Sequence, residues 1–196
     1  MTTALIFAYL GVALMVGVSG LASAVATARC GMASVGAMKK NAGAFGSYMI
    51  LSALPGSQGL YGFVGFFMVQ SFLVEDMPLI TGVGIFGAGL LMAIVTLSSA
   101  LFQAKVCANG IAAIGNGNDV MGKTLILAAF PELYAILGVA ATFLISSAIS
   151  TQGLTDQKDL NKEYVKAELT TEQAQAEGEL EFAEELEKQQ AQNPAK

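Results

Sequence analysis

Long stretches without a charged side chain are the feature that most constrains the fold of this chain. No Asp, Glu, Lys or Arg occurs in residues 1–28, 41–74 or 77–104, and residues 124–155 contain Glu132 as their one charged residue. Each stretch exceeds the roughly 20 residues that cross the hydrocarbon core of a bilayer as a helix. Helices are expected because lipid offers no water to unpaired backbone groups. The sequence therefore predicts an all-α membrane protein with four transmembrane helices, at about 3–28, 44–73, 80–107 and 123–150.

The charged residues between these helices predict how the chain is oriented. Cytoplasmic loops of membrane proteins carry an excess of Lys and Arg. The connections carry Arg29, Lys39 and Lys40 between the first two helices, Glu75 and Asp76 between the middle two, and Lys105 and Lys123 beside the last connection. We therefore expect the first and third loops in the cytoplasm and both termini outside.

The first apolar stretch and the two cysteines bear on processing and redox state. The stretch lacks a basic start and exceeds the 7–15 apolar residues of a signal peptide, so we expect the mature protein to keep it. Cys30 and Cys107 fall near the predicted cytoplasmic ends of the first and third helices. A reducing compartment favours free thiols there.

The chain contains an internal repeat. MILSALP at 49–55 aligns with LILAAFP at 125–131 at an offset of 76 residues. GMASVG at 31–36 aligns with GIAAIG at 110–115 at an offset of 79, which predicts a last connection three residues shorter than the first. Two tandem transmembrane hairpins follow, at 1–77 and 78–154, before an acidic tail at 155–196 that we expect to be partly helical or disordered. Parallel repeats of this kind suit a ring in which each unit packs on the next.

The two kinds of helix differ in side-chain size. The first and third are rich in glycine and other small residues, which let helix backbones approach closely in lipid. The second and fourth carry larger side chains. We expect the thin helices inside and the bulky ones facing lipid. The bulky residues are Phe63, Phe66, Phe67, Phe72, Phe130, Leu133, Leu137 and Phe143.

Glu132 is an isolated acid within the fourth apolar stretch. A carboxylate at the bilayer centre costs about 2.5–3.5 kcal/mol on insertion scales, so such residues usually have a function. The chain has no His, and no Lys or Arg is predicted at a comparable depth. We therefore expect a mobile cation as the partner of Glu132. The repeat places Gly56 opposite Glu132, so the first hairpin has no carboxylate at that position.

Polar residues of other helices are expected near this carboxylate. The segment LPGSQGLYGF at 54–63 carries Ser57, Gln58 and Tyr61, and Gln103 is a lone amide in the third helix. Pro55 should loosen the second helix and free backbone carbonyls. Oxygen ligands suit hard cations, and a single carboxylate favours Na⁺ or H⁺ over Ca²⁺. Taken singly, these polar residues fit interhelical hydrogen bonds equally well.

Together, the duplicated hairpins, LPGSQGLYGF, Gln103 and PELYAILG at 131–138 resemble the membrane rotor subunit, or proteolipid, of V/A-type rotary ATPases. The resemblance covers about 5–150 and excludes the acidic tail. It implies a closed homo-oligomeric ring with the first and third helices inside. It also implies surrounding lipid, a stator subunit that presents an arginine, and central-stalk subunits on the cytoplasmic side.

The resemblance also implies roles for individual residues. A Na⁺ ion would be held by Glu132, Gln58, Gln103, the Ser57 hydroxyl and the Leu54 carbonyl, with Tyr61 hydrogen-bonded to Glu132. Ser57 stands where a threonine is more familiar, and it keeps the hydroxyl.

We therefore expect a multi-pass membrane protein that carries Na⁺ (or H⁺) as part of an ion-transporting ATPase and has no catalytic site of its own. The alternative is a four-helix small multidrug exporter, which would need an aromatic substrate cavity and would leave the repeat unexplained. Nothing in the sequence indicates a nucleic-acid partner.

Overall fold

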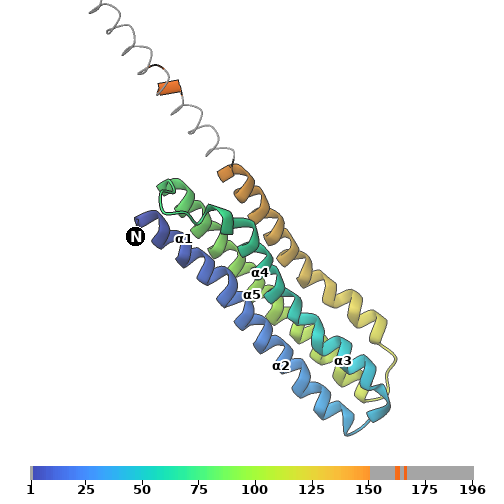
Figure 1. Ribbon diagram of the computed structural model, residues 1–196. Helices are drawn as coiled ribbons and strands as arrows, with labels where there is room; N and C mark the ends of the chain where they lie inside the picture. Colours follow the sequence, from blue (N-terminus) through green and yellow to red (C-terminus); the bar gives the residue numbers. More distant parts are fainter. Residues whose placement is uncertain (1, 151–161, 164–165, 167–196) are drawn as a thin grey trace, which may run out of the picture. The chain divides into compact units, whose positions relative to one another are not determined.

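A computed structural model describes residues 2–150, 162–163 and 166 of this chain, and Figure 1 shows its helices. The prediction of an all-α membrane fold is confirmed, and the described residues contain no strand. Residues 1–149 form one compact unit. The predictions for the acidic tail fall almost entirely outside the described residues.

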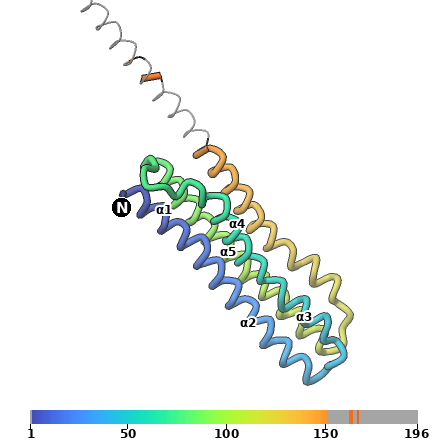
Figure 2. The backbone as a smooth tube through the Cα atoms, viewed as in Figure 1, coloured from blue at the N-terminus to red at the C-terminus, as the bar shows by residue number. Residues whose placement is uncertain are grey.

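Two long rods form the first half of the bundle. The first rod is continuous from Thr3 to Met38 and comprises α1 (Thr3–Ala13), a π-helical turn η1 (Leu14–Val18) and α2 (Ser19–Met38). The second rod runs back through η2 (Ala42–Ala44), α3 (Phe45–Ala53), η3 (Leu54–Gly56), α4 (Ser57–Val69) and η4 (Gln70–Phe72). Figure 2 shows the two rods lying antiparallel.

The second half repeats this hairpin. Its first rod is the unbroken α5 (Leu79–Gly115), and its second is Met121–Ser150, which we call the glutamate helix because it carries Glu132. Thr3–Met38, α5 and the glutamate helix are each long and apolar enough to cross a membrane. The α3–α4 rod is divided at η3, so none of its pieces is that long alone.

The predicted ends of the first and third helices are wrong. The first rod continues to Met38 and α5 to Gly115, well past Arg29 and Lys105. The first basic residue marks where the apolar stretch ends, but Ala-rich sequence continues the helix beyond it. α5 ends where Gly117 adopts φ +89°, a conformation that favours glycine.

The predicted three-residue shortening of the last connection is also wrong. The first connection lies between Met38 and Phe45, and the last between Gly115 and Met121, so they differ by one residue. A single offset of 76 residues therefore aligns the two hairpins from end to end, without the change to 79. The GMASVG and GIAAIG similarity reflects shared small residues rather than the repeat register.

Glycines bring the first rod and α5 into backbone contact. A Cβ added to Gly11 would lie 2.5 Å from the Ile85 oxygen, and one added to Gly89 would lie 2.7 Å from the Gly11 Cα. Only glycine permits this approach. Ser19 and Thr96 share a buried hydrogen bond of 2.7 Å between their hydroxyls across the same contact. Cys30 and Cys107 are buried free thiols in the core beside it.

Most of the bulky side chains of the α4 and glutamate-helix rods point outward from the bundle. Phe66 and Phe72 are half-buried. The others are exposed on this single chain: Phe63, Phe67, Phe130, Leu133, Leu137 and Phe143. The arrangement leaves a wide apolar surface, as expected for a protein surrounded by lipid or by further copies.

The glycine contact yields a stability prediction. Gly89→Ala should destabilise the protein by about 1–3 kcal/mol, because the new methyl group overlaps the Gly11 backbone. Gly36→Ala is the matched control, since a Cβ there meets nothing within 4 Å and Ala112 stands at the equivalent repeat position. It should be neutral or stabilising by up to about 1 kcal/mol. Thermal unfolding in detergent micelles measures both, and an unchanged melting temperature for Gly89→Ala would contradict the close approach.

Candidate functional site

Pro55 interrupts the second rod beside the candidate site. Pro lacks a backbone N–H and clashes with the carbonyl four residues earlier, which breaks regular helical bonding. The α-helix gives way to the 3₁₀ turn η3 at Leu54–Gly56, as expected. The Ser57 hydroxyl donates to the Leu54 carbonyl oxygen at 3.2 Å. Two predicted site oxygens therefore lie together on this turn.

Glu132 accepts one hydrogen bond on each carboxylate oxygen. The Tyr61 hydroxyl donates to Oε1 at 2.7 Å, and Gln103 Nε2 donates to Oε2 at 3.0 Å. Tyr61 comes from α4 and Gln103 from α5, so three helices meet at the carboxylate. Hydrogen bonds to a charged group are worth about 1.5–3 kcal/mol, which holds the carboxylate in one orientation.

Gln58 extends this polar cluster into the core. Its Nε2 donates to Gln103 Oε1 at 2.8 Å and to the Ser99 hydroxyl at 3.0 Å, and both glutamines are fully buried. Gln103 Nε2 also donates to the Ala128 carbonyl at 3.0 Å. A chain of hydrogen bonds thus runs from Gln58 through Gln103 to Glu132.

One atom of this chain is unsatisfied. Within the described part of the protein, Gln58 Oε1 is the buried side-chain polar atom that has no hydrogen-bond partner. An unpaired buried acceptor costs about 1–3 kcal/mol. An amide oxygen is also a favourable ligand for a hard cation. The cluster therefore offers both a negative charge and an oxygen that lacks a partner.

The groups that contact the carboxylate are neutral. Tyr61 and Gln103 donate without carrying a charge. Lys105, two residues from Gln103 in α5, is exposed and lies 4.6 Å from the centre of the Phe102 ring. The single negative charge of Glu132 is therefore oriented by its neighbours but not compensated by them.

The structure brings all six predicted residues to one region. Leu54, Ser57, Gln58 and Tyr61 lie on η3 and α4, Gln103 on α5, and Glu132 on the glutamate helix. Ser99 was missed by the sequence analysis, although it lies four residues before Gln103 and so on the same helix face.

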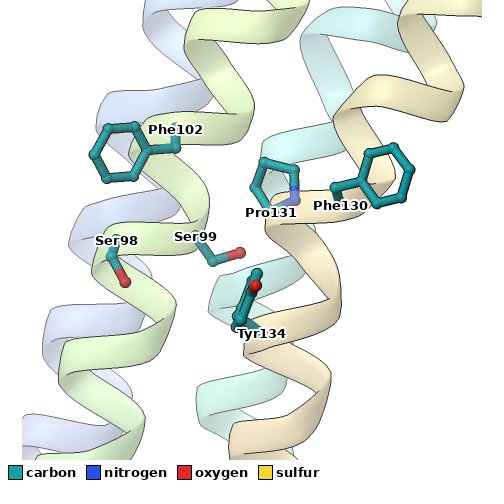
Figure 3. A pocket seen from close by; sticks show the side chains of 6 residues that line it. All are labelled: Ser98, Ser99, Phe102, Phe130, Pro131 and Tyr134. Carbon is teal, nitrogen blue, oxygen red and sulfur yellow. The ribbon is translucent and has the colours of Figure 1, made fainter.

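A pocket opens beside the cluster, between α5 and the glutamate helix. Its volume is about 310 Å³, and Figure 3 shows the side chains around it. Ser99 belongs both to this pocket and to the hydrogen-bonded cluster. The walls are Ser98, Ser99, Phe102, Phe130, Pro131 and Tyr134.

Comparison with known proteins identifies the family of the chain. Residues 10–69 and 86–145 both match the family model for the C subunit of ATP synthase, one match in each hairpin. A V-type sodium ATPase subunit K from Enterococcus hirae is 38% identical over 141 residues, which cover 72% of this chain and 90% of that protein. An A-type ATP synthase subunit K from Methanocaldococcus jannaschii is 30% identical over 145 residues, covering 74% of this chain and 64% of that protein. The chain therefore belongs to the ATP synthase C-subunit family, among the membrane rotor proteolipids of V/A-type rotary ATPases.

Proposed function

We propose that this chain carries Na⁺ across the membrane by binding it reversibly at Glu132, as one unit of a rotor ring. The observation that carries the proposal is the carboxylate held by two neutral donors, linked through Gln103 to a glutamine whose Oε1 is unpaired. The ligands would be Glu132, Gln58, Gln103, the Ser57 hydroxyl and the Leu54 carbonyl, with Tyr61 fixing the carboxylate. The ion is the cargo of the site.

Sodium is preferred because the cluster offers more oxygens than a proton needs. A proton would require the carboxylate alone, whereas Na⁺ is bound by several oxygens that replace its water. The Enterococcus hirae relative is a subunit of a sodium ATPase, which supports the same choice. Protons remain the alternative coupling ion.

Charge neutralisation explains how such a site would move. The loaded site is neutral overall and tolerates lipid, whereas the empty carboxylate does not. We propose that a stator arginine displaces the ion and pairs briefly with Glu132 before the site reloads from the opposite side. Each charge that crosses 100 mV exchanges about 2.3 kcal/mol with the membrane potential. ATP chemistry would belong to other subunits of the complex.

The orientation in the membrane follows from the charged loops. The connection with Lys39 and Lys40 and the one before Lys123 lie at the same end of the bundle, where Lys40 contacts Asn116. The connection with Glu75 and Asp76 lies at the end of the N-terminus, where Thr2 contacts Glu75. We propose that the basic end faces the cytoplasm and the central-stalk subunits, with the N- and C-termini outside. One carboxylate per two hairpins means fewer ions per turn than a ring in which every hairpin carries one, which favours pumping driven by ATP.

The first test removes the charge. Glu132→Gln keeps the shape of the side chain and one acceptor oxygen but carries no negative charge to hold a cation. We expect ion transport by the assembled ATPase to be abolished while the ring still assembles. Glu75→Gln, in the exposed loop, is the control and should leave transport unchanged. Vesicle uptake of radioactive Na⁺ measures both, and residual pumping by Glu132→Gln would disprove the assignment.

The second test identifies the ion. A carbodiimide reacts with a free carboxyl, so bound Na⁺ should slow labelling of Glu132 at constant pH. We expect millimolar NaCl to protect the residue and the same concentration of choline chloride to leave labelling unchanged. Equal labelling in both salts would indicate protons instead of Na⁺.

The third test concerns Tyr61. Tyr61→Phe removes the hydrogen bond to Glu132 Oε1, so the carboxylate loses one of its two orienting groups. A loss of about 1.5 kcal/mol or more corresponds to at least a tenfold weaker Na⁺ affinity. The Na⁺ concentration for half-protection against carbodiimide should rise accordingly. Tyr9→Phe, on the exposed face of α1, should not change it, and an unaltered half-protection concentration for Tyr61→Phe would rule out this role.

A further inference from the structure

The first hairpin keeps a remnant of the polar cluster around Gly56. The Ser23 hydroxyl accepts from the Gly59 N–H at 2.7 Å and donates to the Gly56 carbonyl at 3.3 Å. Thr27 lies beside them, with its hydroxyl donating to the Ser23 carbonyl at 2.8 Å. A Cβ added to Gly56 would meet Thr27 Cγ2 at 3.6 Å and nothing closer, so space remains above this glycine.

The offset of 76 residues relates this cluster to the one at Glu132. Adding 76 converts Ser23 to Ser99, Thr27 to Gln103 and Gly56 to Glu132. The two matches to the family model are separated by the same offset. Each hairpin therefore carries one copy of the same surface, which we call the receiving face. The receiving face of the second hairpin includes the Glu132 carboxylate, and that of the first hairpin has no carboxylate.

The contact that completes the intact cluster also has an equivalent. In one chain, Gln58 of the first hairpin reaches across to Ser99 and Gln103 of the second. The residue equivalent to Gln58 in the second hairpin is Tyr134. Tyr134 is 66% exposed, and its hydroxyl has no hydrogen bond within the described structure. A phenol hydroxyl in apolar surroundings usually finds a partner.

The pocket beside Tyr134 lies on the second hairpin, and the equivalent surface of the first hairpin is covered within the chain. The residues that line it (Figure 3) correspond, at the offset of 76, to residues that the second hairpin covers within the chain. Those first-hairpin residues are Ala22, Ser23, Ala26, Leu54, Pro55 and Gln58, of which Leu54 is half-buried and the others are buried. The open pocket is thus the surface that a further first hairpin would cover.

The opposite side of the chain offers the matching groove. A groove of about 560 Å³ runs between α2 and α3, and its walls include Thr27, Gly31, Ser34 and Ala53. The residues equivalent to Thr27 and Gly31, namely Gln103 and Cys107, are buried against the first hairpin within the chain. Gln103 accepts a hydrogen bond from Gln58, and Cys107 lies in one core cluster with Cys30. The groove is therefore the receiving face that a second hairpin of another copy fits.

We propose that Tyr134 of one copy inserts into this groove over Gly56 of the next copy and donates its hydroxyl hydrogen bond to Thr27 there. The proposal rests on the ring of the proposed function and specifies the contact between its copies. Tyr134 is longer than its equivalent Gln58, which compensates for Thr27 being shorter than its equivalent Gln103. The Tyr134 ring fills the space over Gly56, where the second hairpin has Glu132. A neutral aromatic side chain thereby occupies the position that carries no ion.

Cysteine cross-linking in the assembled protein tests this contact. Thr27→Cys and Tyr134→Cys are combined in one full-length chain in which Cys30 and Cys107 are replaced by Ser. The hydroxyl contact separates the two Cβ atoms by the length of a tyrosine side chain, which is too far for a direct disulfide, so a short bifunctional thiol reagent of matching length is used. Treating membranes with this reagent should convert most of the monomer band into a ladder of covalent multimers. The ladder should be absent when either new cysteine is present alone.

The matched control replaces Tyr134→Cys with Ile136→Cys. Ile136 is equivalent to Leu60, which is 67% exposed and therefore faces away from the second hairpin. This pair should give no ladder. The proposal is overturned if the Ile136 pair cross-links as well as the Tyr134 pair, or if the Tyr134 pair yields only an internally cross-linked monomer.

A size exchange gives a second readout. The Cβ of Gly56→Leu makes only an ordinary contact with Thr27 within the single chain. The leucine should collide with Tyr134 of the neighbouring copy and lower the temperature at which the detergent-solubilised oligomer dissociates. Adding Tyr134→Ala should recover part of that loss, and a double variant no more stable than Gly56→Leu would contradict the contact. Native mass analysis distinguishes failure of this contact from failure of the ring. A many-membered ring without the 27–134 cross-link refutes this contact alone, whereas a monomer refutes the ring as well.

Discussion

The structure depends on one carboxylate that is oriented by neutral groups and left electrically uncompensated. Glu132 receives hydrogen bonds from Tyr61 and Gln103, and the latter is held in turn by Gln58. A fixed cation at this position would satisfy the carboxylate permanently and prevent exchange. A carboxylate without orienting donors would be costly in lipid and loosely placed. The observed arrangement lies between these extremes, which is what reversible binding of a small cation requires.

The scaffold makes that arrangement possible through close packing elsewhere. Gly11 and Gly89 bring the first rod and α5 into backbone contact, so the core of the bundle is narrow. The α4 and glutamate-helix rods then both reach the same stretch of α5, around Ser99 and Gln103. The break at η3 turns the Leu54 carbonyl and Ser57 hydroxyl toward each other, at the start of the helix that carries Tyr61. Small residues and a proline thus position a site to which they contribute few side chains.

Much of this could be predicted from the sequence because its signals are local. Charge-free stretches predict spanning helices, and a lone acid beside a proline-interrupted polar motif indicates a site. The helix ends were wrong because a first charged residue marks where an apolar stretch ends, whereas α2 and α5 remain helical well past that residue. Ser99 was overlooked because a serine in a membrane helix usually bonds its own backbone. Its role as an acceptor for Gln58 depends on how two helices are placed side by side.

The two hairpins differ in side-chain volume as well as in charge, because the first has Gly56 where the second has Glu132. Replacing a glutamate by Gly56 removes a charge that would otherwise need an ion, but it also removes the side-chain volume that separated neighbouring helices. An unfilled space in a membrane interface forfeits the van der Waals contacts that hold helices together there. A compensating increase in size must then come from the facing helix, and in the proposed contact Tyr134 of the neighbouring copy supplies it. Because that side chain is neutral and aromatic, the position would pass through lipid without a bound ion, and Glu132 would be the one ion site of the two hairpins.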